Sequence, residues 1–226
     1  YLKVGDTAYA AGKFREAEQA YDQAEEELDR KEEERNVRRR DIALGKANAA
    51  LAQFNDRETT DRSGLLERAA EAVEKALQLI NEDLDPLLWS KTANDLAKVY
   101  FDLRMFDNAE LLIRRALEID KESFGSDHPL VAIRLNNLAA LLRRANRYDE
   151  AERLFRCALE MNEESFGPDH PQVAVNLNNL AQVLRKTKRV QETESLFRRA
   201  LKIDEESLGP DNPKVAIRLN NLAGLL

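Results

Sequence analysis

A short segment recurs at a fixed spacing in the second half of the chain, and this recurrence limits the possible folds more than any other feature. The segment reads Phe-Gly-Ser-Asp-His-Pro, then Phe-Gly-Pro-Asp-His-Pro, then Leu-Gly-Pro-Asp-Asn-Pro. The three copies begin at Phe124, Phe166 and Leu208, which is a period of 42 residues. The sequence Leu-Asn-Asn-Leu-Ala recurs with the same period. Such a period is typical of arrays in which each unit packs on its neighbours.

Each repeat is predicted to contain two amphipathic helices. In the first helix, leucine and alanine follow the i, i+3, i+4, i+7 spacing of a face that packs on a core. These residues are Leu135, Leu138, Ala139 and Leu142. The second helix has an apolar stripe of its own, formed by Ala151, Leu154, Phe155, Ala158 and Leu159. With only 8 Gly and 6 Pro in 226 residues, little interrupts these helices.

The recurring segment is predicted to end one helix and begin the next. We expect its glycine (Gly125, Gly167, Gly209) to form a left-handed cap, where a Cβ would clash. The proline (Pro129, Pro171, Pro213) suits the first helical turn, and the residue before it should be the cap. His128 and His170 are therefore interpreted as helix-start residues and not as metal ligands, because they lie a full repeat apart.

These residues resemble the tetratricopeptide repeat. The matching positions are the run from Leu135 to Leu142, the turn Asn146-Arg147-Tyr148, and Ala151, Phe155 and Ala158. The 42-residue period with Phe-Gly-Pro-Asp-His-Pro is similar to the kinesin light chain subtype. The resemblance implies an all-α fold, a right-handed α-solenoid (superhelix) of antiparallel helical hairpins. It also implies a non-catalytic protein that binds proteins or peptides.

The whole chain, 1–226, is predicted to be one solenoid. Its parts are repeat 1 (1–30), a degenerate repeat 2 (31–85), repeat 3 (86–128), repeat 4 (129–170), repeat 5 (171–212) and the first helix of an unfinished repeat 6 (213–226). In repeat 2 we expect a long helix through Ile42 to Phe54, a polar loop from Asn55 to Ser63, and a second helix. In repeat 5, Thr193 and Val190 depart from the family pattern, so we expect looser packing there.

The last predicted helix has no second helix to cover it. Its apolar residues are Leu219, Leu222, Leu225 and Leu226. Leaving such side chains exposed forfeits about 1.5–3 kcal/mol each. We therefore expect the sequence to be part of a longer array, and self-association through the open C-terminal helix is the less favoured alternative.

Charge and composition exclude several classes of protein. The net charge of −7 lies in residues 1–85, which contain 14 Lys+Arg against 21 Asp+Glu, and this argues against nucleic-acid binding. No apolar run approaches the roughly 20 residues needed to cross a membrane. Cys157 is the only cysteine, which excludes an internal disulfide and is simplest in a cytoplasmic protein. No catalytic or phosphate-binding motif is present, so we predict neither an enzyme nor a cofactor.

The paired asparagines give the strongest functional signal. In the resembled family the first helix lines the concave surface, and its sixth position commonly contacts the main chain of a ligand. Asn137, Asn179 and Asn221 match that position, and Asn136, Asn178 and Asn220 precede them. An amide both donates and accepts, so it can pair with an extended backbone of any sequence. Alternatively, one asparagine of each pair bonds a neighbouring helix and only holds the stack.

Basic residues follow the asparagines on the same predicted face. They are Arg143, Arg144, Arg185 and Lys186, with Lys91 and Lys98 in repeat 3, where Asp95 replaces the asparagine. Such a row could bind acidic side chains or a C-terminal carboxylate. Kinesin light chains bind acidic peptides, so the resemblance points the same way. The alternative is a solvated helix end, where cations suit the helix dipole.

Three further features are interpreted as structural. We expect Cys157 to be buried or half-buried and Trp89 to belong to the core. The charged stretch from Glu25 to Arg40 is expected to be a solvated helix with pairs Glu26–Arg30, Glu27–Lys31 and Glu34–Arg38.

Two functions remain open. The favoured one is a binding module whose groove holds an extended, acidic partner segment. The alternative is a structural or regulatory scaffold within a larger protein, with intramolecular or self-association contacts.

Overall fold

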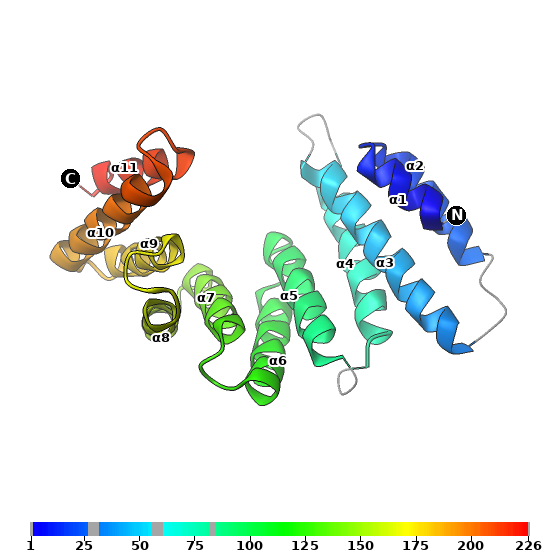
Figure 1. Cartoon of the computed structure of the whole chain (residues 1–226), viewed down its shortest axis with the longest axis horizontal. Coiled ribbons are helices and arrows are strands. Elements are labelled where there is room, and N and C mark those ends of the chain that lie inside the picture. The colour runs from blue at the N-terminus through cyan, green and yellow to red at the C-terminus, as the bar shows by residue number, and fades with distance from the viewer. Residues whose placement is uncertain (1, 27–31, 56–60, 82–84, 226) are drawn as a thin grey trace. The chain divides into compact units, whose positions relative to one another are not determined.

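The chain is all-α within the residues that the structure, a computed structural model, describes: 2–26, 32–55, 61–81 and 85–225. Its helices in chain order are α1 (Leu2–Ala10), α2 (Phe14–Glu26), α3 (Glu32–Asn55), α4 (Arg62–Gln78), α5 (Pro86–Asp102), α6 (Phe106–Phe124), α7 (Pro129–Arg144), α8 (Tyr148–Phe166), α9 (Pro171–Lys186), α10 (Val190–Leu208) and α11 (Pro213–Ala223) (Figure 1). The predicted ion pairs Glu26–Arg30, Glu27–Lys31 and Glu34–Arg38 lie outside the described side chains. Leu226 and part of the loop after Asn55 lie outside the described residues.

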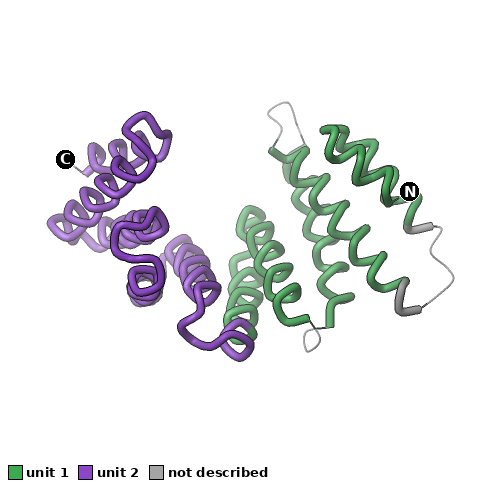
Figure 2. Tube along the Cα trace, viewed as in Figure 1, with its two compact units in different colours: residues 1–119 green, residues 120–226 purple. Residues whose placement is uncertain are grey.

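The helices form two compact units (Figure 2). Unit 1 covers Tyr1–Ile119 and unit 2 covers Asp120–Leu226, so the boundary lies within α6. The continuous solenoid over 1–226 stays a prediction.

In unit 1, the ring of Tyr21 on α2 lies between two helical glycines. A Cβ on Gly5 of α1 would lie 2.5 Å from the ring, and a Cβ on Gly45 of α3 would lie 2.6 Å from it. The Tyr21 hydroxyl donates to Asp6 at 2.9 Å. Burial, with help from that hydrogen bond, raises the pKa of Tyr21 well above its usual value. Glycine is therefore required on both helices because they approach the ring so closely.

Helices α3 and α4 pack against each other. Small buried residues on both helices allow the close approach: Ala43, Ala47 and Ala50 on α3, and Ala69, Ala70 and Ala76 on α4. The Asp61 carboxylate caps α4 by accepting from the Gly64 N–H at 3.0 Å.

Unit 2 consists of two hairpins, α7–α8 and α9–α10, followed by α11. Helix starts are as predicted: proline occupies the first turn, and the residue before it caps the helix. Nδ1 of His128 and of His170 accepts from the backbone at 3.3 and 3.1 Å, and Oδ1 of Asn212 does so at 3.0 Å. The histidine rings also lie 4.9 and 4.8 Å from those of Phe124 and Phe166.

The glycine caps differ from the prediction. Gly167 has φ 87° and ψ 159°, and Gly209 has φ 84° and ψ 153°. The positive φ was expected, but the ψ is extended rather than left-handed helical. This region is open essentially to glycine alone, so the requirement for glycine holds although the cap geometry was wrong.

Other predictions for unit 2 also need correction. Cys157 is exposed, because it lies two residues from Phe155 and so faces away from the core of the hairpin. Thr193 is fully buried and its hydroxyl donates to the Arg189 carbonyl at 2.8 Å, whereas Val190 is 50% exposed, so looser packing of repeat 5 stays a prediction. Leu222 is covered, since it packs with Ala181 and Phe197.

In unit 1, Trp89 was expected to belong to the core and is half-buried.

Buried polar residues lie at equivalent positions of the three repeats in unit 2, as ion pairs in two repeats and as amides in the third, where the Asn176 side chain has no hydrogen-bond partner. Arg134 Nε lies 2.8 Å from Asp120 Oδ2, and Arg218 Nε lies 2.8 Å from Asp204 Oδ2. The repeat between them has Asn162 and Asn176 at both positions, also buried. In this middle repeat two neutral amides replace both members of the ion pair, so no buried charge is left without a partner.

Candidate functional site

The paired asparagines form hydrogen bonds from one repeat to the next. Asn179 Nδ2 on α9 donates to Asn136 Oδ1 on α7 at 3.2 Å, and Asn221 Nδ2 on α11 donates to Asn178 Oδ1 on α9 at 2.7 Å. In both bonds the sixth-position amide donates to the fifth-position oxygen of the preceding repeat. We call Asn136, Asn137, Asn178, Asn179, Asn220 and Asn221 the Asn row. One bond leaves each amide with unused hydrogen-bonding capacity.

The asparagines differ in their access to solvent. Asn178 is 5% exposed and Asn220 is exposed, whereas the other four members of the Asn row are half-buried. The Asn row therefore both holds the stack together and offers a polar surface to solvent. The fifth position supplies mostly acceptors to the stack, and the sixth position supplies donors.

Basic side chains gather at the C-terminal ends of α7 and α9. We call Arg143, Arg144, Arg185 and Lys186 the basic cluster. Arg143 is half-buried and its Nε has no hydrogen-bond partner. Burial lowers the pKa of Arg143, and the nearby positive charges of Arg144 and Arg185 lower it further. Like charges held this close favour an anion between them.

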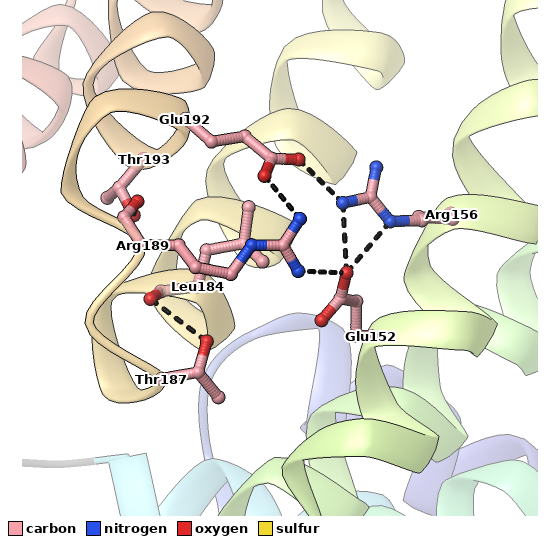
Figure 3. A network of polar contacts seen from close by, with 7 residues as sticks. All are labelled: Glu152, Arg156, Leu184, Thr187, Arg189, Glu192 and Thr193. Carbon is pink, nitrogen blue, oxygen red and sulfur yellow. Dashed lines mark hydrogen bonds and ion pairs between the residues drawn. The ribbon is translucent and has the colours of Figure 1, made fainter.

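The charged side chains of α8 and of the start of α10 are paired with each other. Figure 3 shows Glu152 and Arg156 of α8 facing Arg189 and Glu192 at the start of α10. Arg156 Nη2 lies 2.9 Å from Glu152 Oε1 and 2.6 Å from Glu192 Oε1, and Arg189 Nη1 lies 2.7 Å from Glu152 Oε1. Arg189 also pairs with Glu192. The hydrogen bond from Arg156 lowers the pKa of Glu192.

This network of Glu152, Arg156, Arg189 and Glu192 was not predicted, although a glutamate followed by an arginine four residues later recurs in the repeats. Glutamate recurs at 110, 152 and 194, and arginine recurs four residues later at 114, 156 and 198. Arginines along α8 and α10 are mostly ion-paired in this way. By contrast, Arg143, Arg185 and Lys186 have no ion pair with any acidic group in the described part of the chain.

Lys91 and Lys98 lie in unit 1, on α5. Lys98 Nζ lies 2.9 Å from Asp95 Oδ1, so its charge is matched locally, and Lys91 is exposed. One repeat later their positions are occupied by Ile133 and Ala140. They therefore do not occupy the same repeat positions as the basic cluster.

A second feature that sequence reasoning missed is a groove in unit 1 between α3 and α5. Its volume is about 380 Å³. Leu44, Leu51 and Phe54 line it from α3, and Asp95, Lys98 and Asp102 line it from α5. We call it the α3–α5 groove.

Across the described residues, His, Cys, Asp and Glu side chains form no group of three or more that could hold a metal ion. Among the helices described, none has the length and apolar character needed to cross a membrane.

The repeat assignment is decided by a family model. The tetratricopeptide-repeat model matches residues 90–164, 135–192 and 172–226. The chain belongs to the tetratricopeptide-repeat family. Repeats of this family generally form non-catalytic scaffolds, and this chain is a repeat scaffold for protein interaction. A comparison with curated protein sequences finds no match.

Solved structures share the tetratricopeptide fold at low sequence identity. BtubC (BKLC) from P. vanneervenii is 22% identical, with a TM-score of 0.69 over 94% of this chain and 82% of that one. A putative kinesin light chain of Podosopora anserina with nearly identical TPR-like repeats is 16% identical, with a TM-score of 0.70 over 92% and 94%. The apo form of RapI is 18% identical, with a TM-score of 0.76 over 99% and 81%. The family model and the shared fold of this putative kinesin light chain thus agree with the resemblance of the repeats to the kinesin light chain type.

Proposed function

We propose that unit 2 binds an extended, acidic segment of a protein partner across α7, α9 and α11. The observation that carries the proposal is the contrast between two groups of basic residues in unit 2. Arg156, Arg198 and Arg199 on α8 and α10 are ion-paired with glutamates, whereas Arg143, Arg185 and Lys186 meet no acidic group among the described residues. Carboxylates supplied by a partner would complete these ion pairs.

The Asn row would contribute contacts that do not depend on the partner's sequence. A side-chain amide can donate to a backbone carbonyl and accept from a backbone N–H. Equivalent residues on neighbouring helices lie about 8–10 Å apart, and an extended chain rises about 3.3 Å per residue. One asparagine would therefore serve about every third residue, and the basic cluster would select acidic side chains. A helical partner would gain less binding free energy from the asparagines, since its backbone groups already hydrogen-bond each other.

The test measures binding of a fluorescent Glu-rich peptide to the full chain by anisotropy, at low and high salt. Arg185→Glu should weaken binding at least fivefold at low salt, and the difference should shrink at high salt because ions screen exposed charges. Arg153→Glu is the matched control: it makes the same charge change on an exposed residue of α8. Equal affinities of the two variants would refute the proposal.

The Asn row is tested separately with Asn137→Ala/Asn179→Ala, once circular dichroism shows parental helicity. Weaker binding of acidic and neutral extended peptides alike is expected, because the amides would contact backbone. If only the acidic peptide lost affinity, the asparagines would not have this role.

Self-association through α11 is a second candidate, favoured by Leu219. This leucine is 48% exposed, whereas Leu135 and Leu177 at the same repeat position are 5% and 0% exposed. Light scattering should then show a dimer that Leu219→Glu dissociates, and a monomer at all concentrations would remove this candidate. A cytoplasmic location stays a prediction.

A further inference from the structure

One side of α7 is open to solvent, and its chemistry changes along the helix. Between Val131 and Leu142, a stretch that the structure describes throughout, the positions that are not buried are Ile133, Asn136, Asn137 and Ala140. Residues three, four or seven positions apart lie on the same side of a helix. The accessible side of α7 therefore begins with an aliphatic residue, continues with the Asn row and reaches the basic cluster at its C-terminal end.

The aliphatic residue of this side recurs in each repeat of unit 2. Ile133 is 41% exposed, although Leu135 and Leu138 of the same helix are 5% and 0% exposed. One and two periods later the position holds Val175, which is half-buried, and Ile217, which is 53% exposed. We call Ile133, Val175 and Ile217 the aliphatic row. The packing of the repeats leaves this row accessible, so it offers apolar surface to a ligand.

The Asn row lies between the aliphatic row and the basic cluster. Along α7, Ile133 precedes Asn137 by four residues, about 6 Å, and Arg144 follows Asn137 by seven residues, about 10 Å. Hydrogen bonds between asparagines join α7 to α9 and α9 to α11, so the three helices lie side by side. Equivalent residues of the three repeats therefore form rows that cross the helices.

An extended chain on the Asn row would direct its side chains alternately to the two neighbouring rows. Successive side chains of a strand point to opposite faces, and its backbone N–H and C=O groups point between those faces. When the backbone groups turn to the asparagines, every second side chain faces the aliphatic row and the others face the basic cluster. Seven extended residues span about 20 Å between the first and last Cα atoms, and three adjacent helices span about 16–20 Å.

We propose that the partner segment on this face alternates between aliphatic and acidic residues over about seven positions. Its aliphatic side chains pack on Ile133, Val175 and Ile217, and its carboxylates pair with the basic cluster. A carboxylate on the aliphatic side would instead lose water against apolar side chains. This inference rests on the proposed function, because it concerns the same face, and it adds the order of residues by which the face selects its partner.

The experiment measures binding of labelled heptapeptides with blocked ends to the full chain by anisotropy, each at a concentration at which it is monomeric. Leu-Glu-Leu-Glu-Leu-Glu-Leu and Leu-Leu-Glu-Glu-Glu-Leu-Leu have the same composition and charge and differ only in order. The alternating peptide should bind at least fivefold more tightly than the blocked one. It should also bind at least fivefold more tightly than Ser-Glu-Ser-Glu-Ser-Glu-Ser, which has the acidic side chains in place and nothing to cover the aliphatic row.

Two variants test the aliphatic row, and one is a matched control. Ile133→Ser and, independently, Ile217→Ser should each weaken the alternating Leu-Glu peptide at least fivefold and leave the affinity of the Ser-Glu peptide within twofold, once circular dichroism shows parental helicity. Leu111→Ser makes a similar change at a residue of α6 in unit 1 that is 71% exposed, and it should change both affinities less than twofold.

The outcomes separate this inference from the proposed function. Binding of none of the three peptides would overturn both. Equal affinities of the alternating and blocked peptides would overturn the inference and leave the proposed function standing. Equal effects of Ile133→Ser and Leu111→Ser on the alternating peptide would do the same, because the aliphatic row would then contribute nothing of its own.

Discussion

Removing the Arg218 guanidinium should release α11 from unit 2 without unfolding the other helices. Asp204 is fully buried, and its only hydrogen-bonded oxygen accepts from Arg218 at 2.8 Å. Removing one partner of a buried ion pair costs about 3–5 kcal/mol, since a charge is left uncompensated. Val215 and Leu222, 2% and 9% exposed, hold α11 with about 1.5–3 kcal/mol each. The two magnitudes are comparable, so Arg218→Ala should cancel most of the docking energy of α11.

Hydrogen exchange measured by mass spectrometry on the full chain checks this expectation. Residues 213–225 should exchange far faster in Arg218→Ala than in the parent, whereas α7 and α9 should keep their protection. The double variant Asp204→Asn/Arg218→Asn is the control. It copies Asn162 and Asn176, leaves no buried charge, and should keep most of the protection of α11. An acceleration below about tenfold in Arg218→Ala, equivalent to about 1.4 kcal/mol, would refute the reasoning.

Three further predictions concern single positions. Lys188→Gly should raise the free energy of unfolding by about 1 kcal/mol in urea titrations, because Lys188 has φ 62°, which strains residues with a Cβ; no gain would show that the turn is unstrained. Burial and the hydrogen bond to Glu74 raise the pKa of Tyr100 to about 12. The contribution of Tyr100 to the free energy of unfolding should be complete below pH 10 and lost as the pH rises towards 12. In Glu74→Gln the rise in phenolate absorbance should move to lower pH. An unchanged titration in this variant would show that the hydrogen bond is absent. Gly45→Ala should lower the melting temperature, since overpacking against Tyr21 costs about 1–3 kcal/mol; an unchanged temperature would contradict that contact.

Local signals accounted for most of what the sequence could predict. The proline after His128 and the apolar spacing from Leu135 depend only on neighbours in the chain, so the helix starts and buried stripes were found. The exposure of Cys157 was missed because a thiol is usually buried, although its spacing of two residues from Phe155 pointed outward. The geometry of Gly167 was missed because a positive φ is compatible with more than one ψ.

The candidate sites depended on contacts between repeats, which a single sequence describes poorly. Which asparagine of each pair bonds the neighbouring repeat depends on the rotation of the helices about their axes. The bond from Asn179 to Asn136 was therefore only one of two interpretations that the sequence allowed. The α3–α5 groove forms between helices with unlike sequences, and Leu51 and Asp102 share no motif that would have joined them.

The hydrogen bonds from Asn179 to Asn136 and from Asn221 to Asn178 run in one sense, from the later helix to the earlier one. A partner that accepts the same N–H of Asn179 must compete with Asn136, so ligand binding and contact between hairpins are linked, and linkage is reciprocal. Stretching unit 2 along its stack would break these bonds and present the amides to a ligand. Under mechanical tension this face would therefore hold its partner more tightly, and a bound partner would make the unit more extensible.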